Sequence, residues 1–453
     1  MTHLLCVDIG STFTKAALVE ETGGVLVARA SVATTAGSDV LDGVRAARAD
    51  LAVQAGAGVP EIEDRDRVLI CSSAGGGLRL AVVGYEREIT AEAGGRVGLS
   101  AGAKVVHVVG GALDGAAVAA LRAVRPDVVL LVGGTDGGNA ECIRHNAERL
   151  GRARLRAPVV VAGNRAVQDE VAGILTGAGR RHVLTDNVLP RIGEIAPVAA
   201  RRAIREVFLR HVIGGKGLSR GPLFAALVRA ATPDAVLDGV QVVAGVAGAD
   251  VMVLDVGGAT TDAYSVLTPQ GEDATLRKHV VAPIWAARTV EADLGMRWGA
   301  LGLLAAARRE GLPGADSPTL EDWVQSVTAD PGRLPADEAE RRLDLRLAGF
   351  ACVIAARRHG RPAAPGEQPR PLADVAHLVG SGGALRHGAA AAALEALATV
   401  TADHAGGWRP PTGARGTIDT AYLLGAIGLL APDHPGPARA LAARLGHPDR
   451  SAR

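Results

Sequence analysis

The sequence predicts an α/β protein in which two similar domains face one cleft. A pattern of apolar strand, Asp-x-Gly, hydroxyl cluster and second apolar strand occurs twice, around residues 8–15 and 255–262. Apolar strands, glycine-rich loops and helical stretches alternate through most of the chain, as in α/β domains. At 453 residues the chain is also long for a single core. This internal repetition indicates two related halves, each with one polar hairpin.

The first repeat occupies the N-terminus. Residues 4–7 and 16–19 are apolar runs, and Gly10 permits a tight turn between two strands. The turn region carries side chains whose donors suit phosphate oxygens, namely Ser11, Thr12, Thr14 and Lys15. Asp8, at the end of the first strand, is placed to hold the water shell of Mg²⁺. Taken alone, a hairpin with a merely polar turn is an equal interpretation.

Strands and helices alternate in the rest of the first half. We expect strands at 25–28, 67–71, 104–109, 127–132 and 158–162, and helices at 40–54, 114–124 and 140–150. Ser38 or Asp39 is the N-cap of the first helix. Gly133, Gly134 and Thr135 follow the strand at 127–132, where free amides and a helix N-terminus suit an anion. The small-residue loop 72–77 either approaches a ligand or is a plain turn.

The second half begins with the second repeat. Before it, a helix with a basic face is expected at 197–212, and the glycine-rich loop 214–221 is interpreted as a connector. After it, residues 283–309 have helical composition at both ends, with residues 288–295 between them. Ser317-Pro318 begins a further helix, and 338–358 forms another. A strand at 375–379 enters a glycine-rich loop, as in the first half. Gly425 and Gly428 in a helix at 418–430 indicate close contact with another helix.

Bulk composition excludes several classes of function. Hydrophobic residues make up 48% and charged residues 21%, an ordinary globular balance. A net charge of +1 and 2% aromatic residues give no support for nucleic-acid binding. We see no signal peptide and no apolar run long enough to span a membrane, so we expect a cytoplasmic protein.

Three stretches in this order resemble the phosphate 1, phosphate 2 and adenosine motifs of the ATPase superfamily of actin, heat-shock chaperones and sugar kinases. They are Asp8-Ile9-Gly10-Ser11-Thr12, Asp255-Val256-Gly257-Gly258-Ala259-Thr260-Thr261 and Val379-Gly380-Ser381-Gly382-Gly383. The resemblance implies an α/β fold with two ribonuclease-H-like, actin-like ATPase domains flanking a nucleotide cleft. It divides the chain into a first domain (1–180), a connecting or inserted segment (181–250), a second domain (251–410) and a hinge helix with a tail (411–453).

Within that superfamily the chain resembles the MutL (GlmL) family associated with glutamate mutase. The stretches that carry this resemblance are residues 8–15, 71–77, 133–139, 161–165, 255–262 and 288–298. The family implies a helper ATPase for an adenosylcobalamin-dependent mutase, acting as a chaperone or reactivase, and leaves a homodimer open.

The resemblance also implies how Mg-ATP is held. Residues 10–14 and 257–261 grip the β- and γ-phosphates, and Mg²⁺ is held through waters near Asp8 and Asp255. Residues 380–383 pack against the adenosine. Lys15 either neutralises developing charge or points to solvent. Asp8, Asp255 and Asp262 are alternative bases for the attacking water, and catalysis is mainly positioning and electrostatics.

Three rival functions remain. A small-molecule kinase needs a substrate pocket that no motif marks. An activator of 2-hydroxyacyl-CoA dehydratases shares Gly10-Ser11-Thr12-x-x-Lys15 but needs a cysteine-bound iron–sulfur cluster. The four cysteines show no such grouping and are interpreted as free or buried thiols; they are Cys6, Cys71, Cys142 and Cys352. A nucleotide-dependent scaffold would bind ATP without turnover. The twelve histidines form no metal-binding pattern.

Overall fold

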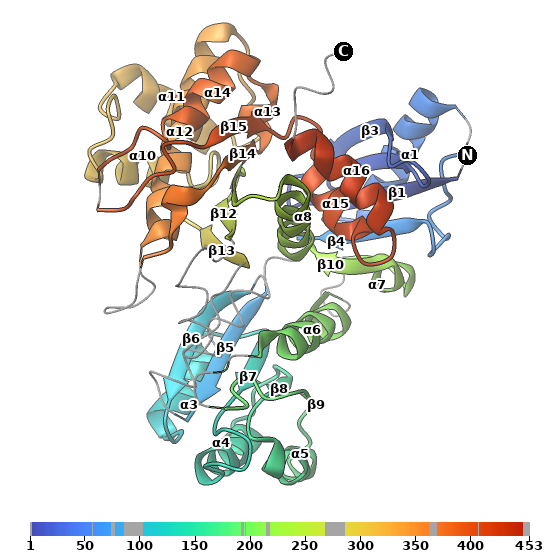
Figure 1. Cartoon of the computed structure of the whole chain (residues 1–453), viewed down its shortest axis with the longest axis vertical. Helices are drawn as coiled ribbons and strands as arrows, with labels where there is room; N and C mark the ends of the chain where they lie inside the picture. Colours follow the sequence, from blue (N-terminus) through green and yellow to red (C-terminus); the bar gives the residue numbers. More distant parts are fainter. Residues whose placement is uncertain are drawn as a thin grey trace.

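The chain is described from a computed structural model, which covers residues 2–56, 58–73, 78–85, 103–191, 194, 196–213, 218–267, 286–361, 369–405 and 407–446. The expected loops at 72–77 and 214–221 lie partly outside these residues. The described strands form three five-stranded sheets (Figure 1).

The first sheet is built from the N-terminus and one later strand. It contains β1 (His3–Ile9), β2 (Phe13–Glu20), β3 (Leu26–Ala33), β4 (Val68–Ser72) and β10 (Val228–Ala231), in the order β10-β4-β1-β2-β3. β1 pairs antiparallel with β2 and parallel with β4. The helix α1 (Val40–Ala55) packs on β2 and β3, and the Asp39 side chain caps it by accepting from the Leu41 N–H. The three predicted N-terminal strands and this helix are confirmed.

The second sheet repeats that arrangement. It contains β11 (Val251–Val256), β12 (Thr261–Val266), β13 (Ala286–Glu291), β14 (His377–Ser381) and β15 (Arg415–Ile418), in the order β13-β12-β11-β14-β15. β11 is antiparallel to β12 and parallel to β14, as β1 is to β2 and β4. Two sheets of equal order and direction confirm the predicted fold class.

Two sequence predictions in this half are wrong. Helical composition is expected at the start of 283–309, with residues 288–295 between the two helical ends, but residues 286–291 form a strand because they pair with β12. The helix expected at 418–430 begins at Leu423, because residue 418 pairs with β14. The predicted close contact is present at Gly428 but not at Gly425, where a Cβ would meet no atom within 4 Å.

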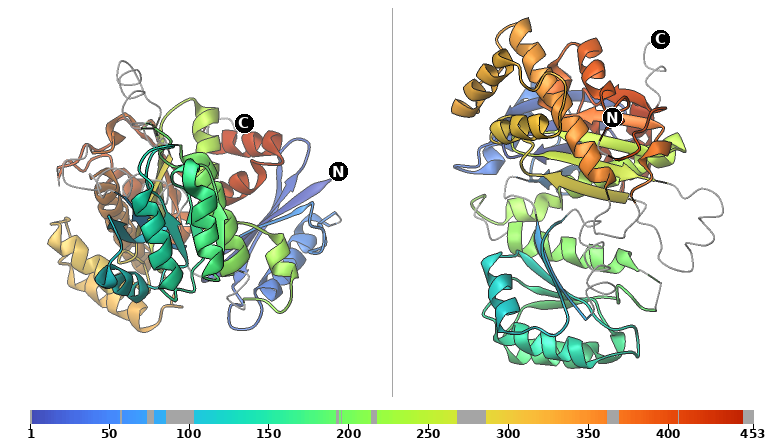
Figure 2. Two further views of the ribbon diagram at one scale, coloured as in Figure 1. Left: turned by 90° about the horizontal axis from the view of Figure 1, so that it is seen from below. Right: turned by 90° about the vertical axis from the view of Figure 1, so that its left-hand side faces the viewer.

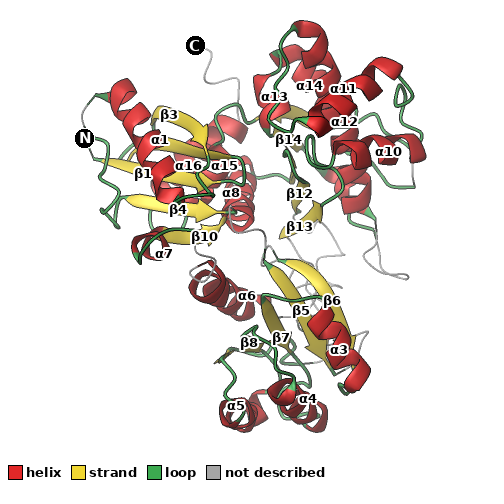
Figure 3. Ribbon diagram, turned by 180° about the vertical axis from the view of Figure 1, so that it is seen from behind, coloured by secondary structure: helices red, strands yellow, loops and turns green. Residues whose placement is uncertain are grey.

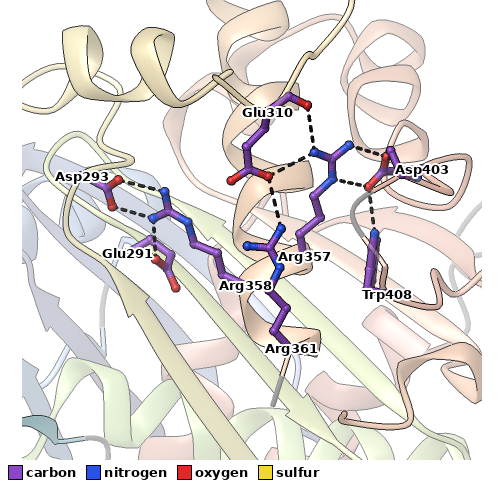
Figure 4. A network of polar contacts seen from close by, with 9 residues as sticks. Glu291, Asp293, Glu310, Arg357, Arg358, Arg361, Asp403 and Trp408 are labelled. Atoms are coloured by element: carbon purple, nitrogen blue, oxygen red, sulfur yellow. Dashed lines mark hydrogen bonds and ion pairs between the residues drawn. The ribbon is translucent and has the colours of Figure 1, made fainter. Parts of the chain in front are cut away.

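Helices cover the second sheet on its outer side. They are α10 (Ala300–Arg309), α11 (Pro318–Ala329), α12 (Glu338–Gly360), α13 (Gly383–His387) and α14 (Ala390–Ala398). Two arginines at the end of α12 fasten this layer (Figure 4). Arg357 pairs with Asp403 and Glu310 at 2.7 and 3.1 Å, and Arg358 pairs with Glu291 and Asp293 at 2.8 and 2.7 Å. The last turns of α12 therefore join β13, α10 and the loop before β15.

The third sheet is entirely parallel and separates β4 from β10 in the sequence. It contains β5 (Arg79–Gly84), β6 (Lys104–Gly110), β7 (Val128–Leu131), β8 (Val159–Val161) and β9 (His182–Leu184), in the order β6-β5-β7-β8-β9. Its helices are α3 (Gly115–Ala123), α4 (Glu141–Arg152), α5 (Gln168–Gly177) and α6 (Pro197–Val207). We call β5 to β9 with α3 to α6 the third lobe, which is set apart from the other two sheets (Figure 2). The boundary expected at residue 180 falls within this lobe, just before β9.

Three helices fill the space between the first two sheets. α8 (Thr232–Ala247) lies between them, with α15 (Leu423–Leu430) and α16 (Pro435–Gly446) beside it (Figure 1). A Cβ at Gly428 would lie 1.7 Å from the Ala235 carbonyl oxygen, and one at Gly239 would lie 2.1 Å from that of Leu424. Glycine at these two positions thus permits the close crossing of α8 and α15. In the described part of the chain no helix combines the length and apolar character that a membrane crossing requires.

Candidate functional site

The two hairpins face one large cavity between the first two sheets. Its volume is about 1070 Å³. The predicted site residues that line it are Asp8, Gly10, Ser11, Thr12, Lys15, Asp255, Gly257, Gly258, Thr260, Asp262, Ser381, Gly382 and Gly383. A space of this size accommodates a nucleotide with its phosphates. The three motifs, far apart in the sequence, thus meet at one site.

Both hairpin turns close by the same backbone contact. The Gly10 N–H donates to the Phe13 carbonyl at 3.0 Å, and the Gly257 N–H donates to the Thr260 carbonyl at 2.9 Å. A Cβ at Gly10 or Gly257 would lie 2.8 or 2.9 Å from that same carbonyl oxygen. Each turn therefore requires a residue without a side chain, because real Cβ atoms do not approach so closely.

Asp8 in the first hairpin has partners from three strands or helices. Its Oδ2 lies 3.6 Å from Lys15 Nζ across the hairpin. Its Oδ1 accepts from Thr232 Oγ1 at 2.5 Å and from Cys71 Sγ at 3.6 Å. These contacts fix the carboxylate at the end of β1, at the wall of the cavity.

The ammonium of Lys15 points into the cleft. It lies 3.9 Å from the centroid of the Tyr422 ring, which also stacks with Arg386 at 4.5 Å. Burial lowers the pKa of Lys15, but the nearby carboxylates, chiefly Asp8, outweigh it, and the pKa is raised. Lys15 therefore carries a full positive charge where the first sheet, the second sheet and the start of α15 meet.

Asp255 holds the position in the second hairpin that Asp8 holds in the first. Burial raises its pKa to about 6; Lys15 and a hydrogen bond from Ser381 oppose the rise, and the charges of Asp262 and Asp8 add to it. Ser381 is the register partner of Asp255 in β14. A carboxylate with this pKa exchanges a proton near neutral pH.

Asp262, opposite Asp255 in the hairpin, is neutralised by an arginine. Arg288 Nε and Nη2 both donate to its Oδ1, at 3.0 and 2.7 Å. The Asp262 side chain is only 14% exposed and that of Arg288 only 7%. The Thr260 hydroxyl contacts the other oxygen at 3.3 Å. The positive charge that pairs with the second hairpin thus comes from Arg288 on the neighbouring strand β13 and not from the hairpin itself.

The adenosine-motif loop presses against the second hairpin. Gly382 has φ +107°, and a Cβ there would lie 2.1 Å from the Val256 carbonyl oxygen. The turn at 257–258 is braced from the other side, because the N–H groups of Met296 and Arg297 donate to the carbonyls of Gly257 and Gly258 at 3.0 and 2.8 Å. Arg297 is itself fixed by a buried pair with Asp344 at 2.9 Å. These contacts hold the loop and the turn in fixed relative positions.

Some predicted ligand contacts do not line this cavity. Thr14 is fully buried and its hydroxyl lies 3.1 Å from that of Thr34, and the Thr261 hydroxyl donates to the Leu294 carbonyl at 2.6 Å. Gly380 packs against Ile418 and Leu385. Thr14, Thr261 and Gly380 therefore make contacts within the protein, whereas the sequence predicted that they contact the nucleotide.

Gly133, Gly134 and Thr135 also lie away from the cavity. They follow β7 in the third lobe, where Gly134 accepts from the Asn187 amide at 3.0 Å. Glycine-rich loops after buried strands look alike in sequence, and only the strand order separates this loop from the adenosine motif. We therefore leave these three residues out of the proposed nucleotide site.

Four functional residues were missed from the sequence. They are Thr232, Arg288, Arg386 and Tyr422, and all four line the cavity. None belongs to an Asp-x-Gly repeat, and each reaches the site through strand pairing or helix packing. The αL backbone of Tyr422, at φ +55°, carries no sequence signal either, since glycine is the usual residue there.

The donor set of the cavity fits a Mg²⁺ ion held through waters. Asp8 and Asp255 both line it, and each acts on the pKa of Lys15, so two carboxylates and one ammonium share a small volume. Within the described ranges no three His, Cys, Asp or Glu side chains form a group that holds a metal on its own. All four cysteines are buried and unpaired, as predicted.

Comparisons with known proteins place the whole chain in one family. The family model described as MutL protein matches residues 4–445. Protein MutL of Clostridium tetanomorphum is 34% identical over 461 residues, covering 96% of this chain and 97% of that protein.

Solved structures of lower similarity were also found. They include a nucleotide-free acetone carboxylase (13% identity, TM-score 0.41, 95% of this chain and 70% of that chain). A second is the activator of the 2-hydroxyisocaproyl-CoA dehydratase from Clostridium difficile with bound ADPNP (9% identity, TM-score 0.30, 100% of this chain and 98% of that chain). A third is a glycerol dehydratase reactivase (14% identity, TM-score 0.36, 94% of this chain and 99% of that chain). All three TM-scores are below 0.5, so the fold assignment rests on the strand order of this chain. The matched family model and the near full-length relative show that the chain belongs to the MutL family.

Proposed function

We propose that this protein is an Mg-ATP-dependent ATPase that reactivates an adenosylcobalamin-dependent mutase, such as glutamate mutase. The main support is the pair of hairpins with the same turn that face one cavity, each with an Asp at the end of its first strand. Family membership supports the mutase partner.

The residues divide the work of binding ATP. The turns at residues 10–12 and 257–260 present backbone amides and hydroxyls to the β- and γ-phosphates, and Lys15 supplies positive charge. The loop at 381–383 meets the adenosine. Asp8 and Asp255 would hold Mg²⁺ through waters, and the bound ion would supply positive charge beside the transferring phosphate.

Of the three candidate bases, we assign Asp255. Asp262 accepts two hydrogen bonds from Arg288, and Asp8 is held by Lys15 and Thr232. Asp255 lines the cavity and has neither an arginine partner nor a lysine contact within 4 Å among the described residues, and burial raises its pKa. It is therefore the one that best accepts the proton of the attacking water.

The proposal is tested by measuring ATP hydrolysis with and without a mutase whose cobalamin has been inactivated. We expect the inactivated mutase to stimulate turnover, and Asp8→Asn to abolish it. Asp42→Asn is the matched control, because Asp42 is a half-exposed carboxylate on α1 that pairs only with Arg45 among the residues described. Tight ATP binding without turnover in either condition would contradict the reactivase and favour a scaffold. Turnover that needs an added small molecule instead of the mutase would favour a kinase.

A further inference from the structure

The helix α8 begins at the proposed nucleotide site. Thr232, its first residue, donates its hydroxyl to Asp8 Oδ1 at 2.5 Å. Thr232 and the following Pro233 both line the cavity. Any displacement of the first turn of α8 therefore changes the hydrogen bonding of Asp8.

Two acidic residues of α8 bind one arginine of the third lobe. Arg205, on α6, pairs with Asp238 through Nη1 at 3.0 Å, and its Nε lies 3.4 Å from Asp234 Oδ2. The Asp234 side chain is 3% exposed, whereas that of Asp238 is 30% exposed. Asp234 lies in the same helical turn as Thr232, so this contact joins the third lobe to the turn that holds Asp8.

The contact between Arg205 and Asp234 is incomplete. Arg205 Nε and Asp234 Oδ1 are buried, and neither has a hydrogen-bond partner among the described residues. Buried groups of this kind are rare and need an explanation. A small shift of α6 along α8 would let the two side chains form a direct hydrogen bond, so the contact gains hydrogen bonding if the third lobe moves.

α6 transmits such a shift to the whole third lobe. Its buried face packs on β7, β8 and β9, and that face consists of Ala200, Ala203, Ile204 and Val207. α6 lies between the third sheet and the part of the molecule that contains α8 and β10 (Figures 1 and 3). α6 is thus packed on the third sheet, and Arg205 joins it to α8 through two carboxylates.

We propose that Arg205 is a positioning residue that couples the third lobe to the nucleotide site through the first turn of α8. The inference rests on the proposed function, since the ligand of that site is taken to be Mg-ATP. In this account nucleotide contacts at Asp8 move the first turn of α8, and Asp234 and Asp238 pass the movement to Arg205 and the third lobe. Because such coupling is reciprocal, a ligand of the third lobe would change the affinity for ATP by the same factor by which ATP changes the affinity for that ligand.

Hydrogen exchange of the full chain, with and without Mg-ATP, tests this coupling. In the natural protein we expect Mg-ATP to slow exchange in the two hairpins and to change it about fivefold or more in α6 and β7 to β9. In Arg205→Gln and Asp238→Asn the hairpins stay protected, while the response of the third lobe falls below about twofold. Arg205→Lys keeps the charge and restores part of the response.

The matched control is Arg144→Gln. It removes an ion pair with Glu170 at 2.7 Å that joins α4 and α5 inside the third lobe without touching α8, so the response to ATP should be unchanged. Asp238→Asn is the second coupling variant because its partly exposed side chain tolerates the change. Protected hairpins with a full third-lobe response in both coupling variants would overturn the coupling alone. Hairpins that ATP leaves unprotected in the natural protein would overturn the proposed function as well.

Discussion

The two hairpins that face the cavity share their backbone but not their charge. Each has an Asp just before the last residue of its first strand and closes its turn with a glycine N–H that donates to a carbonyl three residues on. In the first, Asp8 faces Lys15 across the hairpin; in the second, Asp255 faces Asp262. Asp262 takes its positive partner, Arg288, from the neighbouring strand β13. The comparison teaches that the cation of the first hairpin, Lys15, lies within the hairpin, whereas the second hairpin relies on Arg288 of the next strand, which pairs with Asp262.

Replacing Arg288 and Lys15 in turn should give the largest difference between the two hairpins in the free energy of unfolding. Arg288→Met leaves Asp262, only 14% exposed, with the Thr260 hydroxyl as its partner among the described residues. We expect a loss of about 3 kcal/mol in the free energy of unfolding, since a largely buried charge loses its pair. Lys15→Met should cost about 1 kcal/mol or less, because Asp8 retains Thr232. Urea unfolding of both variants measures the difference, and equal losses would contradict the division of roles.

The turns themselves should respond alike. A Cβ at Gly10 or Gly257 meets a carbonyl oxygen at 2.8 or 2.9 Å, so Gly10→Ala and Gly257→Ala should each cost about 1–3 kcal/mol. The matched control is Gly383→Ala, which also lies on the cavity wall but whose Cβ meets no atom within 4 Å. Thermal unfolding of the three variants compares them. A large effect in only one turn would show that the two hairpins are not equivalent.

A histidine under the second hairpin gives the smallest effect. His359 Nε2 lies 2.8 Å from the Ser265 hydroxyl of β12, and burial, with the charge of Arg370, lowers its pKa well below 6.5. Below that pH the unfolded chain binds a proton that the folded chain does not. The free energy of unfolding should therefore fall by about 1.4 kcal/mol for each unit by which the pH is lowered below 6.5.

This pH dependence is isolated with two variants. His359→Asn should remove it, so that the curves of the variant and the natural protein converge as the pH falls from about 7 to 5. Ser265→Ala loses the same hydrogen bond but no titrating group, and its curve should run parallel to that of the natural protein. Parallel curves for His359→Asn as well would contradict the assignment.

The sequence predicted the features that are local and missed those that depend on pairing. Both hairpins and the loop at 380–383 were found because strand, glycine and hydroxyls follow one another directly. β13 and the contact made by Arg288 were missed because both depend on pairing with β12, which residues 286–291 alone do not indicate. Gly133 to Thr135 were assigned to the wrong site for the same reason, since their place depends on the order of the third sheet. Thr232 enters through the packing of α8, for which its neighbours give no signal.

Calorimetric titration of the protein with Mg-ATP tests the central claim, that the cavity between the hairpins is a nucleotide site. The natural protein should bind one Mg-ATP per chain. Lys15→Met should bind about tenfold or more weakly, because a charge-assisted contact to phosphate is lost. Its fold should be intact by urea unfolding. No binding to the natural protein, or equal affinity in Lys15→Met, would contradict the account.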